Sequence, residues 1–130
     1  MNETAIPQRP SKVRTAVYIL YLILGLETIF SLLIWASADH NSLFVLLTLG
    51  MSLVAALLYY MIWKGKNWAR TTFLLLLIIM LPWRISSWIQ WRIDPTFSDL
   101  LDILGIAEAG LELVALALLY QRDSTEWFKP

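Results

Sequence analysis

Residues 43–63 read LFVLLTLGMSLVAALLYYMIW, an apolar run without a charged side chain. A helix of about 20 apolar residues crosses the roughly 30 Å hydrocarbon core of a bilayer. With three further apolar runs, this stretch gives four expected spans at about residues 13–36, 43–63, 69–91 and 100–120. Because the connections are only a few residues long, consecutive spans should run in opposite directions. We therefore predict one all-α membrane domain over residues 1–130, an antiparallel bundle of four transmembrane helices.

The composition agrees with a membrane protein and excludes several kinds of site. Hydrophobic residues make up 58% of the chain and charged residues 15%, against about 25% charged in soluble domains. The chain has no cysteine, which excludes disulfides and thiolate sites. The only histidine, His40, falls in a short loop, where we expect a solvated side chain and no metal ligand. We expect no cofactor, and no motif of a known enzyme class occurs.

Basic residues beside the spans predict the orientation. Those on the side of both chain ends outnumber those on the other side, which predicts cytoplasmic termini in a bacterial inner (plasma) membrane. The eight on the side of the termini are Arg9, Lys12, Arg14, Lys64, Lys66, Arg70, Arg122 and Lys129. Because topology accounts for them, no nucleic-acid partner is expected. Tryptophan rings favour the bilayer interfaces, and the expected anchors are Trp35, Trp63, Trp68, Trp88, Trp91 and Trp127.

The first apolar run also has features of a secretory signal. Basic residues precede it, and Ala36-Ser37-Ala38 has the form of a cleavage site. A signal contains an apolar region of about 7–15 residues, whereas this run is longer and contains Glu27. We interpret it as a true transmembrane span.

Four ionisable residues fall inside the expected spans: Glu27, Arg84, Glu108 and Glu112. At about 1.5 Å per residue, Glu27, Arg84 and Glu108 each lie roughly 20 Å from the cytoplasmic basic residues. An unpaired charge at this depth costs about 2.5–3.5 kcal/mol. We therefore predict that Arg84 pairs with Glu27 and with one of Glu108 or Glu112. Such a cluster can fix helix register, handle protons or substrate, or dock another membrane protein.

Other residues bear on how the helices pack. Pro82 removes a backbone donor and predicts a kink in the third helix. The Trp-rich stretch after it could carry Arg84 outward to the interface instead of into the cluster. Small residues permit close approach of helices, so Gly50, Gly105 and Ala109 are expected at helix contacts.

Two short segments resemble those of known proteins. Residues 64–70, Lys-Gly-Lys-Asn-Trp-Ala-Arg, resemble the G-[KR]-x-W-A-R turn of many small uncharacterised bacterial inner-membrane proteins. Residues 124–128, Ser-Thr-Glu-Trp-Phe, resemble their S-x-x-W-F ending. The resemblance implies four-helix proteins of unassigned activity and transfers no functional residue. A glutamate in the first of four short spans is also similar to small multidrug-resistance exporters. The chain departs from them by its extra charges at Arg84, Glu108 and Glu112 and by lacking the glycine and aromatic pattern expected around the substrate site.

The sequence leaves three functions open. The first is a non-catalytic accessory subunit, regulator or protective partner of another membrane protein, with a partner protein or a second copy bound in the bilayer. The alternative is a small proton-coupled transporter that uses Glu27. The third is an enzyme that holds a divalent metal at Asp94, Asp99 and Asp102. A closed bundle around Glu27 favours a structural pin, whereas an open cavity that reaches Glu27 favours transport.

Overall fold

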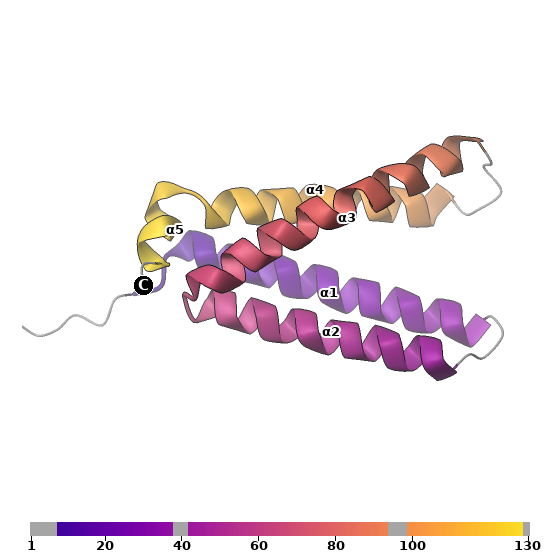
Figure 1. Ribbon diagram of the computed structural model, residues 1–130, viewed down its shortest axis with the longest axis horizontal. Coiled ribbons are helices and arrows are strands. Elements are labelled where there is room, and N and C mark those ends of the chain that lie inside the picture. Colours follow the sequence, from indigo (N-terminus) through magenta and orange to yellow (C-terminus); the bar gives the residue numbers. More distant parts are fainter. Residues whose placement is uncertain (1–7, 38–41, 94–98, 129–130) are drawn as a thin grey trace, which may run out of the picture.

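The structure is a computed structural model that describes residues 8–37, 42–93 and 99–128. All regular secondary structure in these residues is helical. The helices are α1 (Ser11–Ser37), α2 (Ser42–Trp63), α3 (Asn67–Ile93), α4 (Asp99–Leu119) and α5 (Arg122–Trp127). Figure 1 shows the four long helices alongside one another, with the short α5 at one end.

Three of these helices are long and apolar enough to cross a membrane. They are Ser11–Leu33 within α1, Ser42–Trp63 of α2 and Asn67–Ser86 within α3. The prediction of an all-helical, multi-pass membrane protein is confirmed to this extent. α4 has 21 residues, but carboxylates interrupt its apolar sequence, and its crossing of the membrane stays a prediction.

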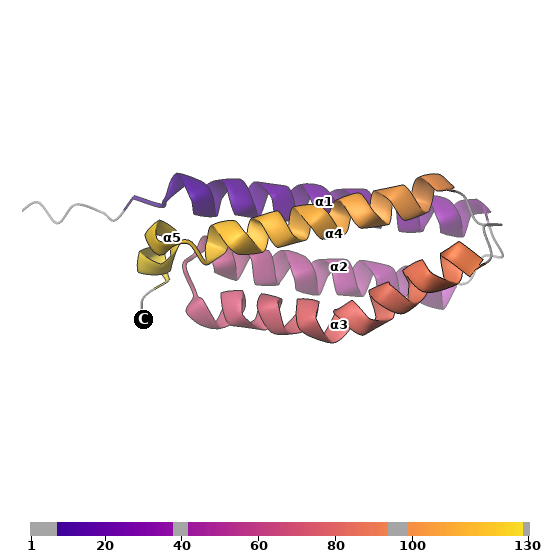
Figure 2. The same ribbon diagram turned by 90° about the horizontal axis from the view of Figure 1, so that it is seen from above.

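The two ends of the molecule differ in what they hold. The α5 end contains the start of α1, the turn at residues 64–66 and α5 itself (Figures 1 and 2). The opposite, far end contains the end of α1 and the starts of α2 and α4. α1 packs against both α2 and α4, whereas α3 crosses the other helices obliquely (Figure 1).

The buried apolar core lies in the half of the molecule next to the α5 end. Each long helix contributes the residues closest to that end, and α5 is followed by a last core residue, Phe128. The core consists of Val13, Ala16, Val17, Leu20, Leu58, Tyr59, Ile62, Ala69, Phe73, Ala115, Leu119 and Phe128. Among the side chains that the structure describes, this cluster is therefore confined to the half next to the α5 end.

The turn between α2 and α3 is built around Gly65. The Lys66 amide donates to the Met61 carbonyl at 3.0 Å, and the Gly65 amide donates to the Ile62 carbonyl at 2.9 Å. This pair of hydrogen bonds ends a helix in a Schellman motif, which requires a left-handed residue after the cap. Gly65 is that residue, with φ of 80°.

The end of the chain closes over this turn. A Cβ atom added to Gly65 would lie 2.8 Å from Nε1 of Trp127. The Ser124 hydroxyl, which is fully buried, donates to the Leu118 carbonyl at 2.6 Å and satisfies one end of α4. The two segments that carry the family resemblance, residues 64–70 and 124–128, therefore lie against each other.

Gly50 and Gly105 do not lie at close contacts between helices of this chain, contrary to the prediction from the sequence. A Cβ atom added to Gly50 or Gly105 would meet no other atom within 4 Å. These glycines do not mark close helix contacts within the chain, because neither faces a neighbouring backbone. Ala109 is partly buried beside a groove described below. Pro82 lies inside the continuous helix α3, and the kink there stays a prediction.

The Gly65 turn can be tested by adding a single methyl group. We expect Gly65→Ala to lower the free energy of unfolding by at least about 1 kcal/mol, because alanine is disfavoured at positive φ and its Cβ would displace Trp127. Gly50→Ala is the matched control, since its Cβ has open space and alanine favours a helix by about 1 kcal/mol. Unfolding of both variants by dodecyl sulfate in mixed micelles makes the comparison. Equal stability of the two variants would contradict the packing of Trp127 on the turn.

Candidate functional site

Three helices bring opposite charges together beyond the core. Arg84 of α3 makes a two-pronged contact with Glu112 of α4: Nη1 donates to Oε2, and Nη2 donates to Oε1 at 3.1 Å. Nη2 also lies 3.9 Å from Oε1 of Glu27 in α1. A planar guanidinium can serve two carboxylates in this way. The cation therefore links α1, α3 and α4 at one level.

The two carboxylates that meet Arg84 are not equivalent. The Glu112 side chain is only 7% exposed, and it receives both of the hydrogen bonds just described. The Glu27 side chain is 41% exposed and lies at the outer limit of an ion pair. Glu112 is thus the buried partner that holds Arg84, and Glu27 is the accessible carboxylate of the cluster.

Glu108 lies one helical turn before Glu112 in α4 and is partly buried. Residues four apart on a helix face the same side, and like charges there repel. With Glu108 included, the cluster holds three carboxylates and one guanidinium. The cluster therefore holds more carboxyl groups than Arg84 can pair with.

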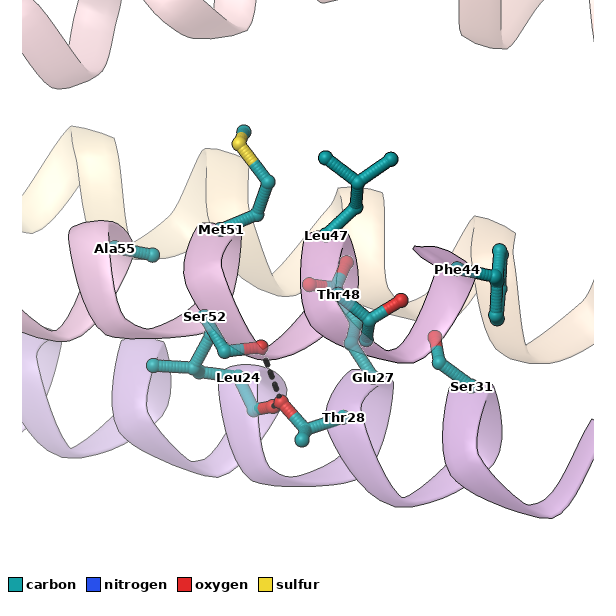
Figure 3. Close-up of a pocket in the computed structure, with 10 residues that line it drawn as sticks. All are labelled: Leu24, Glu27, Thr28, Ser31, Phe44, Leu47, Thr48, Met51, Ser52 and Ala55. Atoms are coloured by element: carbon teal, nitrogen blue, oxygen red, sulfur yellow. Dashed lines mark hydrogen bonds between the residues drawn. The ribbon is translucent and has the colours of Figure 1, made fainter. Parts of the chain in front are cut away.

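A pocket of about 460 Å³ opens beside Glu27, between α1 and α2. Its side chains are drawn in Figure 3. The polar ones are Glu27, Thr28, Ser31, Thr48 and Ser52. Among its apolar side chains are Phe44 and Met51. An accessible carboxylate, hydroxyl groups and apolar walls together make a site that could take a ligand.

Two hydroxyl groups pair at this pocket, Thr28 of α1 and Ser52 of α2. Thr28 Oγ1 donates to the Leu24 carbonyl at 2.7 Å and lies 2.8 Å from Ser52 Oγ (Figure 3). Either hydroxyl can donate in this second contact, and each also has lone pairs that can accept a hydrogen bond.

Two further pockets adjoin the charge cluster. One, of about 160 Å³, lies between α2 and α3 and shares Met51 and Ala55 with the pocket at Glu27. The other, of about 340 Å³, is a groove between α3 and α4. Arg84 and Glu112 line both of these pockets. The pair of Arg84 and Glu112 therefore borders the spaces on both sides of α3.

At the α5 end, a second set of charges lies away from these pockets. Arg70 is buried, and it donates to the Leu119 carbonyl at 3.1 Å and to Asn67 Oδ1 at 2.6 Å. Its guanidinium carbon lies 4.4 Å from the Tyr120 ring centre and 4.6 Å from that of Phe128. Aromatic faces and a helix carboxyl end both stabilise a cation. Arg70 therefore joins α3 to the end of α4 and to the last residues described.

Sequence analysis missed this role of Arg70, because counting basic residues beside spans does not distinguish a buried arginine from an exposed one. The same is true of Arg9. Its guanidinium carbon lies 3.6 Å above the Trp63 ring centre, and its Nε donates to the Trp63 carbonyl at 3.0 Å. The signal that could have found both residues is the cluster of aromatic residues at positions 120–128.

The expected tryptophan anchors occupy different environments. Trp68 is 57% exposed, as an interfacial anchor requires. Trp63 and Trp35 are partly buried, and Trp63 lies under Arg9. Trp127 packs on the Gly65 turn, so its ring supports the fold rather than facing lipid. The side chains of Trp88 and Trp91 lie outside the part of the chain that the structure describes.

The metal site expected by the third hypothesis cannot be placed. The side chains of Asp94, Asp99 and Asp102, and the loop with His40, lie outside the described residues. Among the residues that are described, no group of three His, Asp or Glu side chains is arranged to hold a metal ion.

Comparison of this chain with models of protein families, with curated proteins and with solved structures finds no match.

The pair of Arg84 and Glu112 can be tested by a double-mutant cycle. We expect Arg84→Gln to lower the free energy of unfolding by about 3 kcal/mol, because it leaves the buried Glu112 carboxylate without its cation. Glu112→Gln in the same chain should recover part of that loss, since the uncompensated charge is gone. Unfolding in mixed micelles measures both effects, with the exposed Arg122→Gln as the control. Strictly additive losses would show that the pair does not stabilise the bundle.

Proposed function

We propose that this chain forms an antiparallel bundle of four transmembrane helices in a bacterial inner membrane, with both termini in the cytoplasm. The apolar length of α1, α2 and α3 supports the membrane location. The basic residues Arg14, Lys66 and Arg122 all belong to the α5 end, which supports a cytoplasmic position for that end. A crossing by α4 would place its carboxylates within the membrane, where Arg84 partners one of them.

Single cysteines test this topology without background labelling, because the chain has no cysteine of its own. We expect a membrane-impermeant maleimide to label Ser42→Cys on intact spheroplasts, and to label Lys66→Cys and Gln121→Cys only after permeabilisation. All three positions are exposed. Labelling of Gln121→Cys together with Ser42→Cys would show that α4 does not cross. Labelling of Lys66→Cys and Gln121→Cys, but not of Ser42→Cys, on intact spheroplasts would reverse the proposed orientation.

Within this membrane protein, the function that the geometry supports best is transport of a solute at Glu27. The observation that carries the proposal is the pocket of about 460 Å³ that reaches a 41% exposed intramembrane carboxylate. A carboxylate that served only to fix helix register would be enclosed by its partners, as Glu112 is. Ionisable residues inside a membrane commonly mark substrate or proton pathways.

The asymmetry of the fold fits such a carrier. The core lies in the α5 half, and the pocket at Glu27 lies beyond it. A binding site on one side of a packed core is what a carrier with one-sided access needs. We propose that Glu27 binds either a proton or the solute, so that the two are exchanged across the membrane. Arg84, held by Glu112, lies beside Glu27 and keeps this carboxylate in place when neither ligand is bound.

The accessory role remains the alternative. Its support is the lack of an enzyme motif, together with the wide apolar face of α2, on which Leu46 and Leu53 are exposed. Lipid alone would cover such a face in a transmembrane helix. No feature of the described residues selects a partner protein over lipid.

Replacement of one carboxylate separates the two functions. We expect pyranine-loaded proteoliposomes to show proton flux on addition of tetraethylammonium, lactate or glucose, and Glu27→Gln to abolish the response. Glu126→Gln, an exposed carboxylate in α5, is the matched control and should behave as the unmodified chain. Elution as a single folded species in mild detergent verifies that Glu27→Gln remains intact.

Two results would contradict transport. One is a flux no greater than that of empty liposomes for every solute with the folded, unmodified chain. The other is an undiminished flux in Glu27→Gln. Loss of folded protein in Glu27→Gln, with no flux from the unmodified chain, would favour the structural pin and the accessory role.

A further inference from the structure

The first turns of α1 and the last turns of α2 lie against each other near the α5 end. The ring centre of Tyr18 in α1 lies 5.9 Å from that of Trp63 in α2. Further from that end, the Tyr21 hydroxyl donates to the Ala56 carbonyl at 3.0 Å. Because the start of α1 and the turn after α2 both belong to the α5 end, residues before Tyr18 and after Trp63 lie still closer to it.

Two lines of exposed side chains border this contact. Residues three or four apart on a helix share one side, and the exposed residues follow this spacing on both helices. They are Arg14, Tyr18 and Leu22 on α1, and Leu57, Tyr60 and Lys64 on α2 and the residue after it. We call these six residues the α1–α2 seam.

The seam places its charges nearest the α5 end. At about 1.5 Å per residue, Arg14 lies about 6 Å and Lys64 about 1.5 Å closer to that end than the pair of Tyr18 and Trp63. The two cations therefore differ in level by less than one helical turn. The Lys64 Nζ atom lies 5.3 Å from the Tyr60 ring centre, so its side chain follows the seam.

These two cations have no carboxylate partner among the side chains that the structure describes. The ion pair described at this end joins Lys12 to Asp123 at 3.0 Å. Arg9 adds a third positive charge above the Trp63 ring, at 3.6 Å from its centre. The seam therefore presents positive charge that the described residues leave unneutralised.

The seam changes from charged to apolar with distance from the α5 end. Beyond the cations lie the exposed tyrosines, whose hydroxyl groups can donate hydrogen bonds. Beyond the tyrosines, Leu22 is 59% exposed and Leu57 is 54% exposed. A phospholipid has the same order, from its phosphate through its ester groups to its acyl chains. Phosphate alone would use only the first part of this surface.

We propose that the α1–α2 seam binds an anionic phospholipid of the leaflet on the α5 side, with its phosphate at Arg14 and Lys64 and an acyl chain along Leu22 and Leu57. Basic residues beside a span attract anionic lipids, and tyrosine and tryptophan rings favour this depth. A zwitterionic lipid would place its ammonium group among the cations, so a headgroup with net negative charge fits better. This site is separate from Glu27 and does not depend on transport.

Native mass spectrometry of the full chain in detergent micelles tests the site by lipid titration. The probes are phosphatidylglycerol and phosphatidylcholine with identical acyl chains, and glycerol 3-phosphate serves as a competitor. We expect saturable binding of one phosphatidylglycerol molecule and at least about tenfold weaker binding of phosphatidylcholine. Glycerol 3-phosphate should not displace the lipid, because it lacks the acyl chains.

Two double variants that remove the same charge isolate the seam. Each of Arg14→Gln and Lys64→Gln should weaken binding of phosphatidylglycerol about fivefold, and the pair together about twentyfold. The control is Lys12→Gln with Arg122→Gln, which removes one cation already paired with Asp123 and one exposed cation of α5. It should bind within about twofold of the unmodified chain. Arg14→Lys with Lys64→Arg keeps both charges and should retain the binding.

Three results would overturn the proposal. Equal affinities for the two lipids would show that the headgroup charge is not recognised, and equal losses in the two double variants would show attraction to net charge alone. Displacement of the lipid by glycerol 3-phosphate would show a phosphate site without an acyl-chain part. Binding in micelles depends neither on the orientation of the chain nor on Glu27, so cysteine labelling and the flux assay judge the proposed function separately.

Discussion

The two-pronged contact between Arg84 and Glu112 is the interaction on which the far half of the molecule depends. Between this contact and the core, an apolar groove lies between α3 and α4. Among the described side chains, no other cation pairs with Glu112. Because neither charge can be left alone in an apolar surrounding without a large penalty, the pair holds the two helices at one register. The same pair leaves Glu27 accessible, since the best geometry of the guanidinium is already used.

The level of the cluster could be predicted from the sequence, and its internal arrangement could not. A helix rises about 1.5 Å per residue whatever its neighbours are, so counting from the basic residues placed Glu27 and Arg84 at similar depths. Glu108 and Glu112 lie on one face and one turn apart. The choice between them depends on how far α3 leans toward α4, which is a tertiary property. The exposed fraction of the Glu27 side chain, on which the proposed function depends, is also a tertiary property.

The prediction that small residues mark helix contacts was wrong at two glycines. A small residue permits close approach of two helices but does not cause it, and Gly50 and Gly105 face open space. Gly65 is the position where the backbone does require glycine, because it ends α2 in a left-handed conformation under Trp127. The lysines that surround Gly65 suggested only a cytoplasmic turn. Its partner lies more than sixty residues away in the sequence, so no local pattern could reveal the contact.

The two halves of the molecule stabilise their arginines by different means, and this difference bears on function. At the α5 end, Arg70 is held by a backbone carbonyl, an amide oxygen and two aromatic rings. These partners are neutral and cannot be removed by protonation at ordinary pH. In the cluster, Arg84 is held by carboxylates, whose charge a proton or a cationic ligand can neutralise. The arginine with neutral partners thus lies beside the core, and the arginine with carboxylate partners lies beside the pocket at Glu27.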